Sequence, residues 1–359
     1  CDWRDADQEF TQLAARIERS EKASTPFAAL AITGSPQLQR RVAEVWVKER
    51  CPSGTTLPTL PRYPRHRKIR LGYYSADYHE HATAYLMAEL FEQHDRERFE
   101  LIALSFGRDS QEEIRQRVAA SFDRFIDVKT LSDKEVTALS RDLAIDIAVD
   151  LKGFTEDSRT GIFAERAAPI QVSYLGYPGT MAAEYVDYIL ADRTLVPENS
   201  QPHYSEKIAY LPDSYQVNDR KRPISSRLFA REELGLPRSG FVFCCFNKNY
   251  KITPDMFDVW MRILARVEGS VLWLLEDLPA SAENLRKEAR LRGVSGERLV
   301  FAQRMALEDH LARHRAADLF LDTLPYNAHT TASDALWAGL PVLTCMGDAF
   351  ASRVAASLL

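Results

Sequence analysis

The segment IRLGYYSADYHEHATAYLMAELFEQHDRERFELIALSF, from Ile69 to Phe106, contains a complete strand, helix and strand pattern. The apolar runs IRLGYY and FELIALSF are typical of buried strands, and AYLMAELFEQHDRERF between them has helical spacing. The runs DIAVDL, IQVSYLGY, VDYILAD and KIAYL continue the series, mostly alternating with helical stretches. Ser132 and Glu135 predict a capping box at the start of one such helix. This alternation predicts an α/β protein with a parallel sheet.

A second alternating series starts at FVFCCFN, Phe241 to Asn247, and includes VLWLLE, RLVFA, DLFLDT and PVLTCM. Thr253 before Pro254 predicts the start of its first helix. Neither series opens with G-x-G-x-x-G after its first strand, which argues against a dinucleotide oxidoreductase. We predict two Rossmann-like lobes facing a cleft, an N-terminal lobe at residues 68–223 and a C-terminal lobe at residues 224–359.

The part of the chain before the first lobe has a different pattern. Its apolar residues recur at helical spacing and predict a helical lead-in over residues 1–50. The segment CPSGTTLPTLPRYPRHR, residues 51–67, is dense in Pro, Gly and Thr and predicts a linker. Because the chain starts at Cys1 and stops at Leu359 inside an expected helix, we expect both ends to be cut from something longer and the second lobe to be incomplete.

Composition and charge limit the class of partners. The formal net charge of -5 does not predict an extended basic surface for nucleic acid, although it allows a local basic cleft for a phosphate. No apolar run approaches the roughly 18 residues that a membrane span needs. The five cysteines are scattered without CxxC pairs, which fits a reducing compartment. We therefore expect a soluble, cytoplasmic protein whose partners include neither nucleic acid nor a membrane.

The segment LDTLPYNAHTTASDALWAGLP, Leu321 to Pro341, predicts a strand, a short loop and a helix. Thr330 and Thr331 would stand at the helix N-terminus, where backbone N–H groups and the helix dipole favour an anion. His329 adds a further donor there. We predict a phosphate site at this point, and the alternative is a simple capping box between Thr331 and Asp334.

The segment FNKNYKITP, Phe246 to Pro254, also follows a strand and precedes a helix. It places Lys248 and Lys251 at the carboxyl edge of the second sheet, where open α/β sheets bind ligands. A lysine there would neutralise a diphosphate leaving group. The alternative is that both are ordinary solvated loop lysines.

His81 follows the first strand of the first lobe, at the start of a helix, where it would face the cleft. His79, Glu80 and His81 are neighbours, but there is no HExxH motif and no third ligand within sequence reach, so we predict no metal site. The Asp-x-Asp triplet at residues 5–7 lies in the lead-in helix rather than on a loop of a lobe. For His81, a polar positioning group and a plain surface residue are the alternatives.

Two glycine-containing loops follow other strands of the first lobe. They are GFT, Gly153 to Thr155, and LGYPGT, Leu175 to Thr180. Their glycines would allow the backbone to approach a ligand closely, so we predict that both loops line the cleft. The alternative is ordinary turn chemistry.

Seven motifs occur in a fixed order along the chain. They are GYYSADYHEHATAYLM, DLKGFT, APIQVSYLGYPGT, YSEKIAYLPDSYQVND, FNKNYKI, LDTLPYNAHTTASDALWAGLPVLT and ASRVAASLL. Together they resemble the catalytic region of the O-GlcNAc transferases and bacterial SPINDLY-like proteins, over nearly the whole chain. The resemblance implies a GT-B fold and an inverting, metal-independent transfer of a sugar, with UDP-GlcNAc as the expected donor, to Ser or Thr of a protein or peptide acceptor. Such proteins usually carry tetratricopeptide (TPR) repeats, and the helical lead-in looks like the end of that region.

The resemblance also implies roles for individual residues. Lys251 would stabilise the leaving diphosphate and His81 would act beside the acceptor, with the general base open between His81 and the donor phosphate. The expected nucleotide-sugar contacts are Lys248, Tyr250, Met305, His310, His329, Thr330, Thr331 and Asp334. Among them, Asp334 would reach the ribose and His310 would stack near the base. The expected sugar and acceptor pocket consists of Thr155, Gly176, Pro178 and Tyr326. No metal and no cofactor besides the donor substrate is expected.

Three positions depart from the animal members of this family. Leu307 and His314 stand where those enzymes have a lysine and an arginine near the nucleotide, and Tyr326 replaces a small residue beside the N-acetyl pocket. Because plant SPINDLY proteins of similar sequence are associated with GDP-fucose, protein O-fucosyl transfer stays open as a second function. A catalytically inert nucleotide-sugar or peptide-binding module also stays open, as does a GT-B epimerase or free-sugar transferase.

Overall fold

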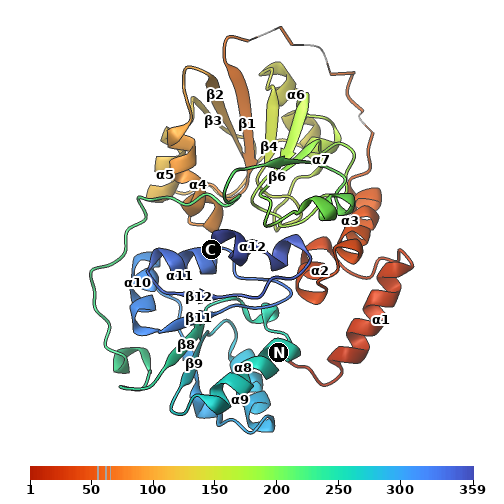
Figure 1. Ribbon diagram of the computed structural model, residues 1–359. Helices are drawn as coiled ribbons and strands as arrows, with labels where there is room; N and C mark the ends of the chain where they lie inside the picture. The colour runs from red at the N-terminus through yellow and green to blue at the C-terminus, as the bar shows by residue number, and fades with distance from the viewer. Residues whose placement is uncertain (55, 61–62, 65) are drawn as a thin grey trace. The chain divides into compact units, whose positions relative to one another are not determined.

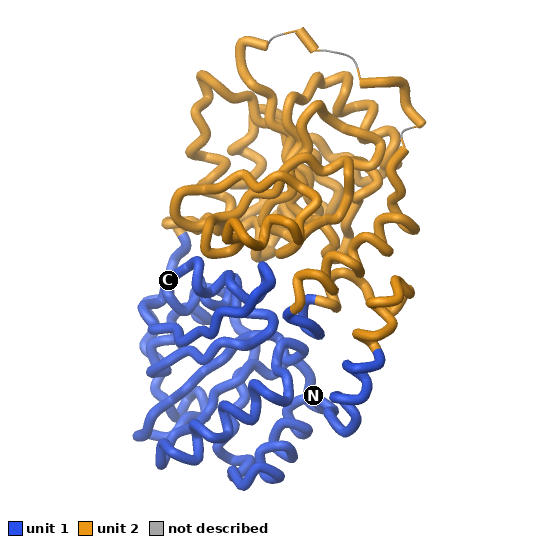
Figure 2. Tube along the Cα trace, turned by 45° about the vertical axis from the view of Figure 1, so that its right-hand side comes forward, with its two compact units in different colours: residues 1–12, 30–34, 222–359 blue, residues 13–29, 35–221 orange. Residues whose placement is uncertain are grey.

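The structure is a computed structural model that describes residues 1–54, 56–60, 63–64 and 66–359. The chain divides into two compact units, coloured separately in Figure 2. Unit 1 comprises residues 1–12, 30–34 and 222–359, and unit 2 comprises residues 13–29 and 35–221. Each unit contains one sheet and the helices that cover it, as an α/β protein requires.

Three helices form the start of the chain (Figure 1). They are α1 (Ala6–Glu18), α2 (Pro26–Ile32) and α3 (Pro36–Arg50). Ile17, Ala29 and Val42 bury a small apolar cluster among them. The described residues between 51 and 67 form neither helix nor strand, as a linker does, and residues 55, 61, 62 and 65 of the predicted linker lie outside the described residues.

Unit 2 contains a seven-stranded parallel sheet in the order β3-β2-β1-β4-β5-β6-β7. Its strands are β1 (Ile69–Ser75), β2 (Phe99–Ser105), β3 (Arg124–Asp127), β4 (Ile147–Asp150), β5 (Ile170–Ser173), β6 (Tyr188–Ala191) and β7 (Lys207–Tyr210). Its remaining helices are α4 (Ala82–Gln93), α5 (Glu113–Ala120), α6 (Asp133–Asp142) and α7 (Gly161–Ala164). Central strands of such a sheet are covered on both faces, so they need continuous apolar runs. Tyr73 in β1 shows this position, because it is buried and pairs in register with Ala103 in β2 and Val149 in β4.

Unit 1 contains a five-stranded parallel sheet in the order β10-β9-β8-β11-β12. Its strands are β8 (Val242–Cys245), β9 (Val271–Leu275), β10 (Leu299–Ala302), β11 (Leu319–Leu321) and β12 (Val342–Leu343). Its helices include α8 (Pro254–Arg266), α9 (Pro279–Leu291), α10 (Leu307–Arg313), α11 (Thr330–Trp337) and α12 (Val354–Leu358). In Figure 1, α11 lies beside α10 and β12, which agrees with their close backbone contacts. The core between sheet and helices contains Trp260, Trp273 and Phe320, all almost fully buried.

Local sequence signals account for the predicted helix starts. The capping box is confirmed, because the Ser132 hydroxyl accepts from the Glu135 backbone N–H while the Glu135 carboxylate accepts from the Ser132 backbone N–H. Thr253 caps α8 with Pro254 in its first turn, as predicted. The edge strand β3 was not predicted, because its sequence RFID is charged at both ends and only partly buried. Across the described residues, no helix has both the length and the apolar character of a membrane span.

Each sheet has one point where the chain order reverses. In unit 2 it lies between β1 and β4, and in unit 1 between β8 and β11. The loops after two such strands turn away from each other toward opposite faces, which opens a crevice at the carboxyl edge of the sheet. Ligands of open α/β sheets bind at this switch point, so the four loops after β1, β4, β8 and β11 are the first places to examine for a site.

Candidate functional site

The switch point of unit 1 holds a buried lysine. The Nζ atom of Lys251, in the loop after β8, donates to the carbonyl oxygen of Asn327 at 2.8 Å and lies 3.6 Å from the centre of the Tyr326 ring. Burial lowers the pKa of Lys251 to about 7, and the Asp322 carboxylate opposes this shift. In such a poorly solvated position an ammonium interacts strongly with any anion that reaches it.

Asp322 fixes the loop that faces this lysine. One carboxylate oxygen accepts from the backbone N–H groups of Thr323 at 2.7 Å and Ala328 at 2.5 Å, and the other accepts from the Thr344 hydroxyl at 2.7 Å. Burial raises the pKa of Asp322 to about 6. Asp322 is not among the predicted site residues, although an acidic residue directly after the buried strand β11 is a usable signal.

The N-terminus of α11 lies in the same loop region. His329 is the N-cap residue, but its side chain makes no capping bond. Thr331 donates its hydroxyl to the side-chain oxygen of Asn247, and Asp334 pairs with Arg222. The capping-box alternative for Thr331 and Asp334 is therefore wrong. The first backbone N–H groups of α11 lack intrahelical acceptors, as at every helix N-terminus, and together with the dipole they favour an anion.

His329 is neutral in this cluster. Its Nε2 atom lies 3.1 Å from the carbonyl oxygen of Ala351, and because a carbonyl only accepts, Nε2 carries the proton. Its ring packs against Tyr326 with 5.0 Å between ring centres. Burial and the nearby Lys251 charge hold the pKa of His329 well below its ordinary value. Lys251 therefore supplies the positive charge here, and His329 adds a neutral polar ring.

A second cluster forms where α10 packs on the residue after β8. Nη2 of Arg313 lies 2.6 Å from Nδ1 of His310, and since a guanidinium only donates, Nδ1 is the acceptor. The rings of His310 and Phe246 are 5.3 Å apart, and the Arg313 guanidinium lies 4.5 Å from the Phe246 ring centre. Burial lowers the pKa of His310 to about 2, so its ring is neutral. His314 stands where the animal members of the resembled family have an arginine. The neighbouring Arg313 supplies a guanidinium beside that position.

The switch point of unit 2 holds a buried ion pair. Nζ of Lys152, after β4, donates to both carboxylate oxygens of Asp77, after β1, at 2.8 Å. Nδ1 of His81 lies 3.5 Å from Asp77 and accepts from the backbone N–H of Thr83 at 3.2 Å. A neutral His81 in this geometry carries its proton on Nε2, which makes Nε2 a hydrogen-bond donor. His81 is among the predicted site residues, whereas Asp77 and Lys152 are not.

The glycine-containing loops of unit 2 reach the same edge of the sheet. A Cβ atom on Gly176, after β5, would lie 2.1 Å from the carbonyl oxygen of Leu151, so this close approach requires glycine. The Thr155 hydroxyl donates to the carbonyl oxygen of Lys152 at 2.9 Å, and Pro178 is buried. These contacts support the turn interpretation of both loops and keep them beside the residues of the switch point.

The predicted residues of unit 1 are only partly brought together. Lys251, Tyr326 and His329 form one cluster, and the Tyr250 ring lies 6.2 Å from that of Tyr326. Lys248 is exposed on the same loop, and Met305 lies in the loop between β10 and α10. Sequence reasoning missed the residues that hold this cluster in place, which are Asn247, Asp322, Thr323 and Asn327. It also missed Arg313, which contacts His310 in the second cluster.

The described residues contain no candidate metal site. Within the described ranges, no three His, Cys, Asp or Glu side chains are grouped so that they could hold a metal ion.

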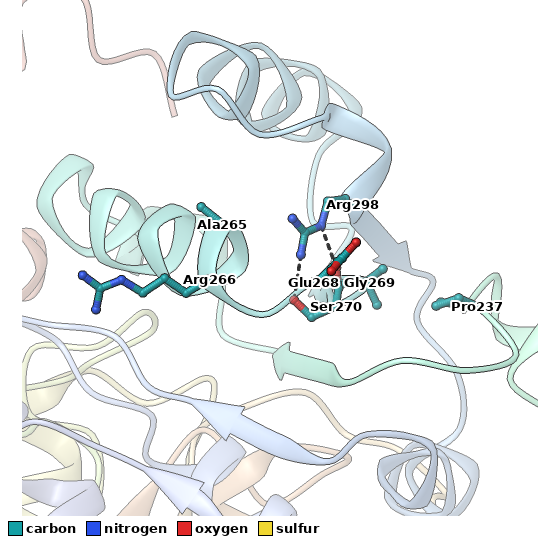
Figure 3. Close-up of a pocket in the computed structure, with 8 residues that line it drawn as sticks. Pro237, Ala265, Arg266, Glu268, Gly269, Ser270 and Arg298 are labelled. Carbon is teal, nitrogen blue, oxygen red and sulfur yellow. Dashed lines mark hydrogen bonds between the residues drawn. The ribbon is translucent and has the colours of Figure 1, made fainter.

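A surface hollow of about 460 Å³ lies away from this site, at the start of β9 and thus at the opposite edge of the unit 1 sheet (Figure 3). The guanidinium of Arg298 is already hydrogen-bonded, because it donates to the carbonyl oxygens of Leu264 in the last turn of α8 and of Val267 and Ser270 just after it.

Comparison with known proteins identifies the family. The sequence pattern of glycosyl transferase family 41 matches residues 60–227 and 219–359, which is most of the chain. The chain belongs to glycosyl transferase family 41. Both switch points, with Lys251 in unit 1 and His81 in unit 2, lie inside the residues matched to family 41.

Curated relatives agree with membership of family 41. The chain is 34% identical over 379 residues to the probable UDP-N-acetylglucosamine–peptide N-acetylglucosaminyltransferase SEC of Arabidopsis thaliana, with 100% of this chain and 39% of the relative aligned. It is 27% identical over 406 residues to the enzyme named UDP-N-acetylglucosamine–peptide N-acetylglucosaminyltransferase from Caenorhabditis elegans, with 82% of this chain and 35% of the relative aligned. The chain therefore spans about two fifths or less of the length of these family 41 relatives.

A solved structure confirms the fold class. The chain matches a mutant of the Thermobaculum terrenum O-GlcNAc transferase with a TM-score of 0.84 and 31% identity, covering 99% of this chain and 68% of that one. The α/β class with parallel sheets, the GT-B assignment and the preceding helices are thereby confirmed, as is the resemblance to the O-GlcNAc transferase and SPINDLY-like group of family 41.

Proposed function

We propose that this chain is the catalytic region of an inverting glycosyltransferase that moves GlcNAc from UDP-GlcNAc to Ser or Thr of protein acceptors. The observation that carries the proposal is the buried Lys251 beside the N-terminus of α11, at the switch point of unit 1, in a chain of family 41. The names of the relatives in Arabidopsis and Caenorhabditis support UDP-GlcNAc as donor and a peptide as acceptor.

The leaving group of this reaction develops charge that unit 1 is suited to stabilise. As the acceptor oxygen bonds to the anomeric carbon, the bond from that carbon to the diphosphate breaks and the diphosphate keeps the electron pair. We propose that Lys251 and the first N–H groups of α11 bind that charge, with Thr331 held in place by Asn247. The arriving diphosphate also favours the charged form of Lys251, whose pKa burial has lowered to about 7.

The remaining predicted contacts bind the base, the ribose, the diphosphate and the sugar of the donor. We propose that His310 stacks near the base, that backbone around Met305 meets the base edge, and that Asp334 accepts from the ribose. Lys248, Tyr250 and Thr330 would complete the diphosphate and sugar contacts. No metal is needed in this proposal, because lysine and helix N–H groups supply the charge stabilisation.

On the acceptor side we propose a positioning role for His81. Its Nδ1 atom accepts from the Thr83 N–H, so in the neutral ring Nε2 carries the proton and acts as a hydrogen-bond donor rather than as a base. The proton of the acceptor hydroxyl would then leave to the donor phosphate, which is the other candidate base. Thr155, Gly176, Pro178 and Tyr326 would border the sugar and acceptor, and we propose a cytoplasmic setting for the reaction.

The test is a transfer assay on Ser- and Thr-containing peptides with UDP-GlcNAc, read by mass spectrometry. The unaltered chain should add one N-acetylhexosamine, and Lys251→Met should lower kcat by about 10²- to 10³-fold with little change in donor affinity. Lys287→Met removes an exposed lysine of α9 and serves as the control for loss of charge. Binding of UDP without any transfer would support the inert binding module, and transfer from GDP-fucose alone would support fucosylation.

A further inference from the structure

We propose that Arg222 is a positioning residue for the donor ribose, acting through Asp334. This inference rests on the proposed function, in which Asp334 accepts from the ribose. Nη1 of Arg222 lies 2.6 Å from a carboxylate oxygen of Asp334, and both side chains are almost fully buried, with 2% and 7% exposed. Such a pair is costly to build, so its place beside a predicted ligand contact requires an explanation.

Asp334 lies where a nucleoside should follow a diphosphate. It stands three and four residues after Thr331 and Thr330, so the three side chains share one face of α11. One helical turn rises about 5.4 Å, which separates the carboxylate from the helix N-terminus by roughly the spacing between a diphosphate and its ribose. A ribose hydroxyl donating to Asp334 therefore fits a donor whose diphosphate binds at the start of α11.

Arg222 is held firmly and is almost fully buried. Its backbone carbonyl accepts from Nε1 of Trp337 at 3.2 Å, and its guanidinium lies 5.9 Å from the Trp337 ring centre. Its Nε and Nη2 atoms are buried and have no hydrogen-bond partner among the described residues. Because these atoms are covered, the influence of Arg222 on a ligand must pass through Asp334.

The charge of Arg222 keeps the Asp334 carboxylate ionised, so that it can accept a hydrogen bond from a ribose hydroxyl. Burial raises the pKa of Asp334, and the adjacent guanidinium counteracts this effect. Without the guanidinium, a buried Asp334 would take up a proton or turn away, and either change weakens its bond to a ribose hydroxyl. Arg222 should therefore control how strongly the site distinguishes a ribose from a ribose without hydroxyls.

The experiment compares UDP with 2′,3′-dideoxy-UDP by titration calorimetry on the whole chain. The unaltered chain should bind UDP roughly 10- to 100-fold more tightly than the dideoxy compound, the range for a hydrogen bond to a charged group. In Arg222→Met this ratio should fall close to one. Arg222→Lys, which keeps the charge, should restore part of the ratio.

The ratio of the affinities for UDP and 2′,3′-dideoxy-UDP distinguishes a positioning role of Arg222 from a merely structural one. If Arg222 only supports the fold, Arg222→Met weakens both compounds equally and the ratio stays at the unaltered value, which overturns the inference. Arg231→Met, which breaks an ion pair with Asp318 at the other edge of the sheet, is the matched control and should keep the full ratio. Failure of the unaltered chain to bind either UDP or GDP would instead overturn the proposed function, and the inference with it.

Discussion

Replacing Lys251 with methionine should stabilise unit 1 at neutral pH. Burial lowers the pKa of Lys251 from 10.5 to about 7 in the folded chain. Between these two values the unfolded chain binds a proton that the folded chain does not, so stability contributed by this residue rises with pH across that window. Below pH 7 the folded chain keeps the full penalty of a buried ammonium.

The size of the effect follows from this pKa difference. A difference of one in pKa corresponds to about 1.4 kcal/mol, so the buried ammonium destabilises the fold by roughly 4–5 kcal/mol below pH 7. Linkage removes about 2 kcal/mol of this penalty between pH 7 and pH 9. Lys251→Met should therefore stabilise more at pH 7 than at pH 9, by about 2 kcal/mol. Comparing the two pH values cancels any difference in packing between lysine and methionine.

Urea unfolding at both pH values, followed by tryptophan fluorescence, measures this difference. Four of the five tryptophans report on unit 1, namely Trp3, Trp260, Trp273 and Trp337. Lys248→Met is the control, because Lys248 is exposed on the same loop and its replacement removes no buried charge. A stabilisation by Lys251→Met that is equal at pH 7 and pH 9, or a destabilisation at pH 7, would show that Lys251 is not a buried ammonium with a lowered pKa.

Substitutions at Gly176 and His81 and the pH dependence of turnover give three independent tests of this geometry. Gly176→Ala should lower the free energy of unfolding by about 2–3 kcal/mol or more, because its Cβ would meet the Leu151 carbonyl oxygen at 2.1 Å; an unchanged urea midpoint would contradict this. His81→Gln should stay within about 10-fold of the unaltered kcat because its amide N–H replaces Nε2–H, whereas a general base would lose 10²- to 10⁴-fold with either Gln or Ala. Donor kcat/KM should fall as pH rises through about 7, where free Lys251 loses its proton, and a profile that is flat up to pH 9 would exclude that role.

The fold was readable from the sequence because both sheets are parallel. Strands that are buried on both faces need continuous apolar runs, and FVFCC and IRLGYY supply them. Strand β3 was not predicted, because it lies at the sheet edge and has only two apolar residues, between Arg124 and Asp127. Helix starts were equally legible wherever a capping residue makes a local bond, as Ser132 and Thr253 do.

For the site, the sequence predicts which loops carry the functional side chains but not the partners of those side chains. Loops after strands at a switch point can be located from the strand pattern, which is how Lys251 and His81 were found. The partners of these side chains come from distant parts of the chain, as with Asp77 and Lys152, and no local pattern encodes such pairing. The pair of Arg222 and Asp334, 112 residues apart, depends on tertiary packing in the same way.

We expect unit 1 to bind a uridine diphosphate sugar at the switch point between β8 and β11, and the proposed function depends on this binding. Titration calorimetry of the chain with UDP, GDP, UDP-GlcNAc and GDP-fucose measures it. UDP and UDP-GlcNAc should bind, and Thr331→Val should weaken both by up to about 10-fold. Binding of GDP and GDP-fucose in their place would contradict the proposed donor, and no binding of any of the four would contradict the site.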